Sequence, residues 1–459
     1  MGYDRFQHTG GNTIMDQKQA VMDLTEGKPI IRILHFSMPL IFGTLFQQLY
    51  NFADTVIVGR CIGMEALAAV GTTYSLNFLI LGFVQGFCIG LGILLARSFG
   101  AKDARALHGY FWNGVWLCAG ISAVLTVGML LSARSLLIFM HTPENLLEMA
   151  VTYIRIIFLG IPVSVLYNYS SSAMRAVGDS KHPFYFLLFS SGLNILLDYL
   201  LIVPGGMGVA GAAAATVFSQ LVSGLLNVWW MMRKMNVFSR RRSEMVFVPS
   251  LAGALCRIAV PMGLEYSVSA IGAVAMQNAI NCLGSTAVAA QTTGEKIRQM
   301  FTLPMESVGM AMATYVGQNH GAGRFDRIRS GIRSGLLIQA VYCAAAWGAI
   351  WLLRDRFVYL VLGETVSPEA HGAMQYLSLI SALFLLHGAL MIFRNTLQGL
   401  GYSFHAILSG VGELIGRSMG GWIAIAMSSY TVICLTNPLA WGLALLYCAV
   451  MVGAKLKGR

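Results

Sequence analysis

The sequence predicts an all-α membrane protein whose twelve transmembrane helices form two pseudo-symmetric six-helix lobes. Of its 459 residues, 56% are hydrophobic and only 11% are charged, whereas a soluble domain carries roughly a quarter charged residues. Apolar segments recur along the whole chain, and its two halves resemble each other. Because the charged residues are too few to coat a soluble globule of this size, the excess apolar surface must face lipid.

Twelve apolar segments are long enough to cross a bilayer, which requires roughly 20 helical residues. In chain order they occupy residues 33–58, 68–96, 110–132, 150–173, 184–203, 209–232, 255–282, 287–316, 332–353, 371–394, 405–427 and 432–454. Several are longer than a straight crossing needs, so we expect tilted helices or helices that extend beyond the membrane. Pro39 and Pro162 lie inside two of these segments and are expected to bend them.

The chain divides into five parts. We expect an N-terminal segment (1–32), an N-lobe (33–232), a basic connection (233–254), a C-lobe (255–454) and a short tail (455–459). The connection from Arg233 to Ser250 is too polar to enter lipid.

Matching residues recur at a nearly constant spacing between the two halves. Pro39 matches Pro261, and Gly63, Ala66 and Ala69 match Gly284, Ala287 and Ala290. The segment from Arg175 to Ser180 likewise resembles the segment from Gln398 to Ser403. Because six spans separate the copies, the halves share one orientation and form parallel repeats about an axis along the membrane normal.

The basic residues predict the orientation. Most of the 31 lysines and arginines fall in the terminal segments and in the loops after even-numbered spans, and Arg394 is counted with them; the opposite side carries only Arg60, Arg134, Arg354 and Arg356. Such an asymmetry places both termini in the cytoplasm. The net charge of +11 is therefore a topogenic signal, and we expect no nucleic-acid partner.

Six acidic residues lie inside predicted spans: Asp54, Asp198, Glu265, Glu295, Glu306 and Glu413. A charged side chain at the centre of a membrane helix costs about 2.5–3.5 kcal/mol on insertion scales. Each of these acids therefore requires a partner, an aqueous cavity or a function.

Three motifs resemble the multidrug and toxic compound extrusion (MATE) family. They are the stretch from Leu49 to Gly59 with Gly63 and Ala66 to Val70, the segment from Ala96 to Asp103, and the segment from Arg175 to Asp179. The resemblance extends over nearly the whole chain. It implies the twelve-helix fold of the wider flippase superfamily and secondary active export of amphiphilic, often cationic organic compounds by antiport with Na⁺ or H⁺.

The N-lobe contains a set of oxygen ligands. Asn194 and Asp198 are four residues apart and share one helix face, and Asp54, Asn168 and Thr216 lie on other spans. Carboxylates, a carboxamide and a hydroxyl suit Na⁺. The set is similar to the N-lobe cation site of archaeal and DinF-like MATE proteins, which implies Na⁺ at Asp54, Asn194, Asp198 and Thr216. The alternative is that these groups only hold helices together.

The C-lobe acids have two open interpretations. Glu413 and Arg417 are spaced for an ion pair within one helix, Glu295 and Lys296 lie beside Arg298, and Glu265 follows Pro261. These groups either form structural ion pairs or take part in coupling. Some NorM-like members use an acid in span seven and an aspartate in span ten, but span ten here has neither Asp nor Glu.

The resulting hypothesis is a multi-pass, monomeric antiporter of the plasma membrane, with small organic substrates and with Na⁺ or H⁺ in place of any cofactor. Pro39 is its expected hinge, because bending of the first helix is thought to accompany coupling in MATE proteins. The nearest alternative is a lipid-linked oligosaccharide or polysaccharide flippase of the same superfamily. An enzyme is not expected, because the chain has no HExxH or GxSxG motif.

Overall fold

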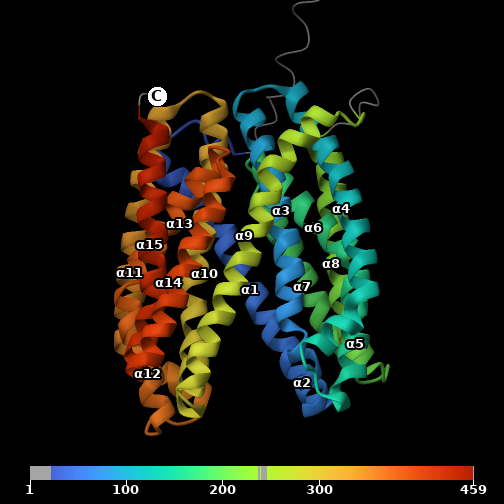
Figure 1. Cartoon of the computed structure of the whole chain (residues 1–459). Coiled ribbons are helices and arrows are strands. Elements are labelled where there is room, and N and C mark those ends of the chain that lie inside the picture. Colours follow the sequence, from blue (N-terminus) through green and yellow to red (C-terminus); the bar gives the residue numbers. More distant parts are fainter. Residues whose placement is uncertain (1–21, 236–237, 239–244, 458–459) are drawn as a thin grey trace, which may run out of the picture.

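The computed structural model describes residues 22–235, 238 and 245–457. These residues form fifteen α-helices and no strand, which confirms the all-α prediction. Figure 1 shows the helices as two upright bundles, formed mainly by the two halves of the chain. The first parts of the helices Pro29–Cys61 and Pro249–Cys282 pack in the core of the opposite bundle. Both ends of the described chain lie at the same end of the molecule, which we name the terminal end.

The N-terminal bundle contains eight helices, namely α1 (Pro29–Cys61), α2 (Met64–Thr72), α3 (Tyr74–Gly100), α4 (Ala104–Phe139), α5 (Glu144–Leu159), α6 (Ile161–Ala176), α7 (Lys181–Ile202) and α8 (Gly208–Lys234). Pro29 opens α1, where a missing backbone N–H costs nothing. The Asp103 carboxylate accepts the backbone N–H of Ala106 at 2.9 Å and so caps α4. The expected bend near Pro162 appears as a 45° break between α5 and α6.

The C-terminal bundle contains seven helices, namely α9 (Pro249–Cys282), α10 (Ser285–Gly321), α11 (Phe325–Leu362), α12 (Pro368–Ala382), α13 (Phe384–Gly399), α14 (Ser403–Met427) and α15 (Tyr430–Leu456). Helix α9 begins at Pro249, so residues 249–254 of the expected connection are helical. A 50° break separates α12 from α13, at the position in this half that matches the break between α5 and α6.

Eight helices in the described part of the chain are long and apolar enough to cross a membrane, and the two bent pairs raise that number to ten. Helices α10 and α14 lie within the same bundle but are more polar, because α10 contains Glu295, Lys296, Arg298 and Glu306, and α14 contains Glu413 and Arg417. With these two helices, every one of the twelve predicted spans coincides with a helix or a bent pair.

The backbone reproduces the internal repeat. Gly63 precedes α2 with φ of +123°, and its match Gly284 precedes α10 with φ of +94°. Gly178 follows α6 with φ of +96°, and Gly401 follows α13 with φ of +82°. Residues with a Cβ rarely adopt this conformation. The sparse sequence matches therefore mark equivalent turns in the two halves.

The two lobes contact each other at the terminal end and diverge towards the opposite end (Figure 1). A side chain at Gly86 would collide with the backbone of Met262 on α9, and a side chain at Gly90 would collide with Ala259. The glycines of α3 thus allow the close approach of α9. Their GxxxG spacing serves the contact between the lobes.

A short segment closes the terminal end. The backbone N–H of Met22 donates to the Gly178 carbonyl of the N-lobe at 3.3 Å. The N–H of Leu24 donates to Oε1 of Gln318 at 3.0 Å, and Nδ2 of Asn319 donates to the Leu24 carbonyl at 3.2 Å. The Leu24 side chain is fully buried in the C-lobe core. Residues 22–26, which we name the N-terminal strap, therefore bind both lobes.

Candidate functional site

Two acidic residues meet inside the N-lobe. Asp54 is on α1 and Asp198 is on α7, and their carboxyl groups lie within hydrogen-bonding reach of each other. Asp198 is fully buried. No N–H or O–H of the described residues donates to either oxygen of Asp198 or to Oδ1 of Asp54. Because two carboxylates are both acceptors, this pair requires a proton or a cation between them.

Neutral oxygen ligands lie beside the acid pair. Asn194, one turn before Asp198 on α7, is buried, and its side-chain amide has no partner among the described residues. Asn194 lines a pocket together with Thr216 of α8 and Tyr50 of α1, and Tyr50 interacts electrostatically with both aspartates. The pocket has a volume of about 20 Å³. That volume admits one water molecule or a small cation.

Asn168 makes a contact within its own helix. Its Nδ2 donates to the Ser164 carbonyl of its own helix at 2.8 Å, and its side chain does not line the pocket. Its neighbour Tyr167 lines the pocket instead. The structure thus pairs Asp54 with Asp198, and it places Asn194 and Thr216 on one pocket that Asn168 does not line.

Further groups near the acid pair were not identified from the sequence. Tyr153 of α5 interacts electrostatically with both aspartates. The hydroxyls of Ser219 and Ser223 on α8 line the same pocket, are buried and have no partner among the described residues. These hydroxyls follow Thr216 at helical spacing, so the sequence pattern places all three on one face of α8.

The four oxygen-bearing side chains fit a small monovalent cation. They provide two carboxylates, one amide oxygen and one hydroxyl, which are hard ligands suited to Na⁺. The same carboxylates also accept a proton. Since their buried oxygens have no donor within the described part of the chain, either ion would supply the missing charge.

The C-lobe acids are arranged differently. Arg394 of α13 forms an ion pair with Glu413 of α14, and its Nε lies 3.4 Å from Oε1 of Glu265 on α9. Arg417 donates to Oε2 of Glu413 at 3.0 Å. All four side chains are largely buried. Each acid in this cluster therefore has a cationic partner.

The cluster extends through Asn437 of α15. Asn437 accepts from Nε of Arg417 at 3.2 Å and donates to Oε1 of Glu295 at 3.1 Å. Glu295 also accepts hydrogen bonds from Nη2 of Arg298 at 2.5 Å and from the Tyr376 hydroxyl at 2.6 Å. One C-lobe network thus joins four of the five predicted polar residues: Glu265, Glu295, Glu413 and Arg417.

The fifth predicted residue, Lys296, is exposed, and no hydrogen bond or ion pair within the described chain connects it to the network. Its neighbour Arg298 is the cation that pairs with Glu295. The assignment of Arg394 to a cytoplasmic loop is wrong, because this residue is buried within α13 and lies in the centre of the network. The helix continues to Gly399, past the end of the predicted span.

Glu306 is a further C-lobe acid that the sequence left without a role. Its Oε1 lies 3.8 Å from Nε2 of His387 on α13, and its side chain is 47% exposed. It is more exposed than the acids of the network, of which Glu265 and Glu413 are nearly fully buried.

Comparisons with known proteins place this arrangement in a family. The MatE family matches residues 39–200 and 261–415, one segment in each half. The probable multidrug resistance protein YpnP of Bacillus subtilis is 28% identical, with 83% of this chain and 84% of the relative covered. The probable multidrug resistance protein NorM of Thermotoga maritima is 24% identical, with 83% and 84% covered.

Solved structures share the fold. An outward-facing multidrug resistance MATE family transporter of the MOP superfamily has a TM-score of 0.88 at 23% identity, with 95% of this chain and 98% of that chain covered. A MATE protein in complex with MaL6 also has a TM-score of 0.88, at 22% identity, with 95% and 99% covered. These likenesses confirm the twelve-helix fold in two lobes. The chain belongs to the MatE family and is a multi-pass membrane efflux transporter of the MATE type.

Proposed function

We propose that this protein is a secondary active antiporter that exports amphiphilic, often cationic organic compounds in exchange for Na⁺ or H⁺. The observation that carries the proposal is the acid pair of the N-lobe. Asp54 and Asp198 lie within hydrogen-bonding reach of each other, and no described residue donates to their buried oxygens. Asn194, one turn before Asp198, lines a small pocket of neutral oxygen ligands. The names of the relatives, which are multidrug resistance proteins, support export of foreign organic compounds.

The coupling ion acts by joining helices. An ion bound between Asp54 and Asp198 connects α1 to α7, because the two carboxylates repel each other when no ion neutralises them. Pro39 lies within α1, where it removes one backbone hydrogen bond and permits the helix to bend. Binding of the ion is thus linked to the shape of α1, and Pro39 is the proposed hinge.

The orientation follows from the basic residues. Their distribution supports a cytoplasmic position for the terminal end, in a protein of the plasma membrane. Since the lobes contact each other at that end, the arrangement is outward-facing. Transport then requires the lobes to rock about the central axis. Each monovalent cation that enters supplies about 2.3 kcal/mol per 100 mV of membrane potential.

The flippase alternative receives less support. A lipid pyrophosphate requires a strongly cationic surface, whereas three of the C-lobe arginines, Arg298, Arg394 and Arg417, are each paired with a glutamate and so form no cluster of unpaired cations. We therefore favour the antiporter.

The test is dye efflux from liposomes under separately imposed Na⁺ and pH gradients. We expect one gradient to drive efflux, and that gradient identifies the coupling ion. Asp198→Asn should abolish gradient-driven efflux while the variant still inserts and folds. Glu364→Gln, which removes an exposed acid, is the matched control and should retain full transport.

Two outcomes would refute the proposal. Efflux by the wild-type protein that responds to neither gradient excludes antiport. Full gradient-driven efflux by Asp198→Asn excludes the N-lobe acid pair as the coupling site.

A further inference from the structure

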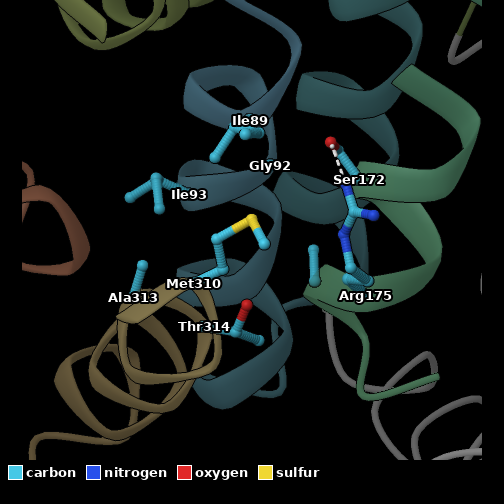
Figure 2. A pocket seen from close by; sticks show the side chains of 9 residues that line it. Ile89, Gly92, Ile93, Ser172, Arg175, Met310, Ala313 and Thr314 are labelled. Carbon is cyan, nitrogen blue, oxygen red and sulfur yellow. Dashed lines mark hydrogen bonds between the residues drawn. The ribbon is translucent and has the colours of Figure 1, made fainter. Parts of the chain in front are cut away.

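A second small pocket, of about 20 Å³, lies between the lobes. Gly92 of α3 and Arg175 of α6 line it from the N-lobe, and Met310 and Thr314 of α10 line it from the C-lobe (Figure 2). Ala176 also lines the pocket, and its carbonyl accepts a hydrogen bond from Nε2 of Gln318 at 2.9 Å. The pocket therefore lies next to the lobe contacts that close the terminal end.

The guanidinium of Arg175 has no acidic partner among the described residues. It donates from Nη2 to the Ser172 hydroxyl at 3.0 Å, as Figure 2 shows. No carboxylate of the described residues forms an ion pair with it, and its electrostatic neighbours include the neutral hydroxyls of Tyr167 and Tyr266. In this respect Arg175 differs from Arg298, Arg394 and Arg417.

A guanidinium that has no counter-ion between the two lobes favours an anionic ligand. A guanidinium carries five N–H donors, and Ser172 satisfies one of them. The remaining donors form a planar fork that matches the two oxygens of a carboxylate. Arg175 is half-buried and lines the pocket.

The shape and walls of the pocket define the ligand. Its volume admits a small group of a larger molecule. Thr314 adds a hydroxyl opposite Arg175, and Ile93 and Met310 provide apolar wall. An anionic group at the end of an apolar body fits this combination.

We infer that Arg175 binds the carboxylate of an exported amphiphile, so that the substrates of this transporter include zwitterions. This inference rests on the proposed function, because it names a substrate class for the same efflux pathway. The carboxylate bridges the lobes by accepting from Arg175 on α6 and from Thr314 on α10.

The test uses two dyes that differ at one group. Rhodamine 110 carries a free carboxylate, and rhodamine 123 is its methyl ester. In Arg175→Gln we expect the KM for rhodamine 110 to rise about tenfold, the factor that corresponds to about 1.4 kcal/mol. The KM for rhodamine 123 should stay within about twofold, because the ester does not need the charge.

Arg155→Gln is the matched control, since it removes an exposed arginine of the same lobe, and it should alter neither dye. Arg175→Lys should retain part of the preference for rhodamine 110, since it keeps the charge but loses the fork. An equal loss for both dyes in Arg175→Gln means that Arg175 only supports the lobe contact and overturns the inference. Unchanged values for both dyes overturn it as well.

A binding measurement keeps the inference separate from the proposed function. The fluorescence of each dye is titrated with wild-type protein in detergent, where no gradient exists. Tighter binding of rhodamine 110 than of rhodamine 123, lost in Thr314→Val, supports the carboxylate site even if liposome efflux proves independent of both gradients. Equal or tighter binding of the ester refutes the site even if antiport is established.

Discussion

The two lobes contain buried acids in opposite electrostatic settings. In the N-lobe, Asp54 and Asp198 face each other, and no described residue donates to the Asp198 oxygens. In the C-lobe, Arg394 and Arg417 both bind Glu413, and Arg298 binds Glu295. The repeated fold thus holds one site that lacks a counter-charge and one network that carries its own.

This difference separates the roles of the lobes. A buried ion pair gains little net stability from its charges, but removal of one partner is strongly destabilising. The C-lobe network therefore holds α9, α13, α14 and α15 together and resists change. The N-lobe pair has no cationic partner among the described residues. Its charge is therefore neutralised only by a proton or a cation that enters from solvent. A site that exchanges ions with solvent must, like the N-lobe pair, lack a permanent counter-charge.

The largest expected effect is the loss of stability when Arg394 is neutralised. Arg394→Gln leaves Glu265 without its cation and Glu413 with Arg417 alone, and we expect a loss of about 3–5 kcal/mol in the free energy of unfolding. Denaturant titration of the detergent-solubilised protein measures it. Asp198→Asn is the matched neutralisation in the N-lobe and should not destabilise by more than about 1 kcal/mol, since it removes a charge that has no partner.

Equal losses in the two variants would break the comparison between the lobes. They would mean that the N-lobe acids hold their helices together just as the C-lobe network does. The asparagines and aspartates of the N-lobe would then be structural groups and not ion ligands.

A smaller effect is expected from the coupling ion itself. If Na⁺ is that ion, a concentration of 100 times its Kd stabilises the wild-type protein by about 2.7 kcal/mol. The stabilisation should vanish in Asp198→Asn and persist in Arg394→Lys, which alters the C-lobe network and retains its charge. Melting curves in NaCl and in choline chloride at equal ionic strength measure it. A sodium effect that survives in Asp198→Asn would place the ion elsewhere.

The sequence predicts the helices well because membrane insertion depends on local composition. A long apolar segment must cross the bilayer whatever its neighbours are. The acid pair was also predictable, since Asp54 and Asp198 are too costly in lipid to lack a purpose. Even α10 and α14, which are less apolar than the other spans, lie where the pattern places them.

Arg394 shows where such reasoning fails. It follows an apolar run that ends at Phe393, so the pattern is typical of a charge at a membrane surface. Its two carboxylate partners are on α9 and α14, and no local pattern reveals a contact between distant helices. The rotation of a helix about its axis is equally hidden, and it decides which neighbours of an asparagine or a lysine come within reach.

Asn168 gives the smallest and sharpest prediction. Its amide is bonded to the Ser164 carbonyl, while the amide of Asn194 has no partner among the described residues and lines the pocket. The two asparagines are of the same type in the same lobe, so they form a matched pair.

We expect Asn194→Ala to raise the concentration of Na⁺ or H⁺ needed for half-maximal efflux by about tenfold, the loss of one strong ligand contact. Asn168→Ala should change it by less than about twofold, because only a bond within one helix is lost. Efflux titrated against the driving ion in liposomes measures both. The reverse order of the two effects would show that the polar face of α6 points to the ion. Asn168, and not Asn194, would then be the amide ligand of the site.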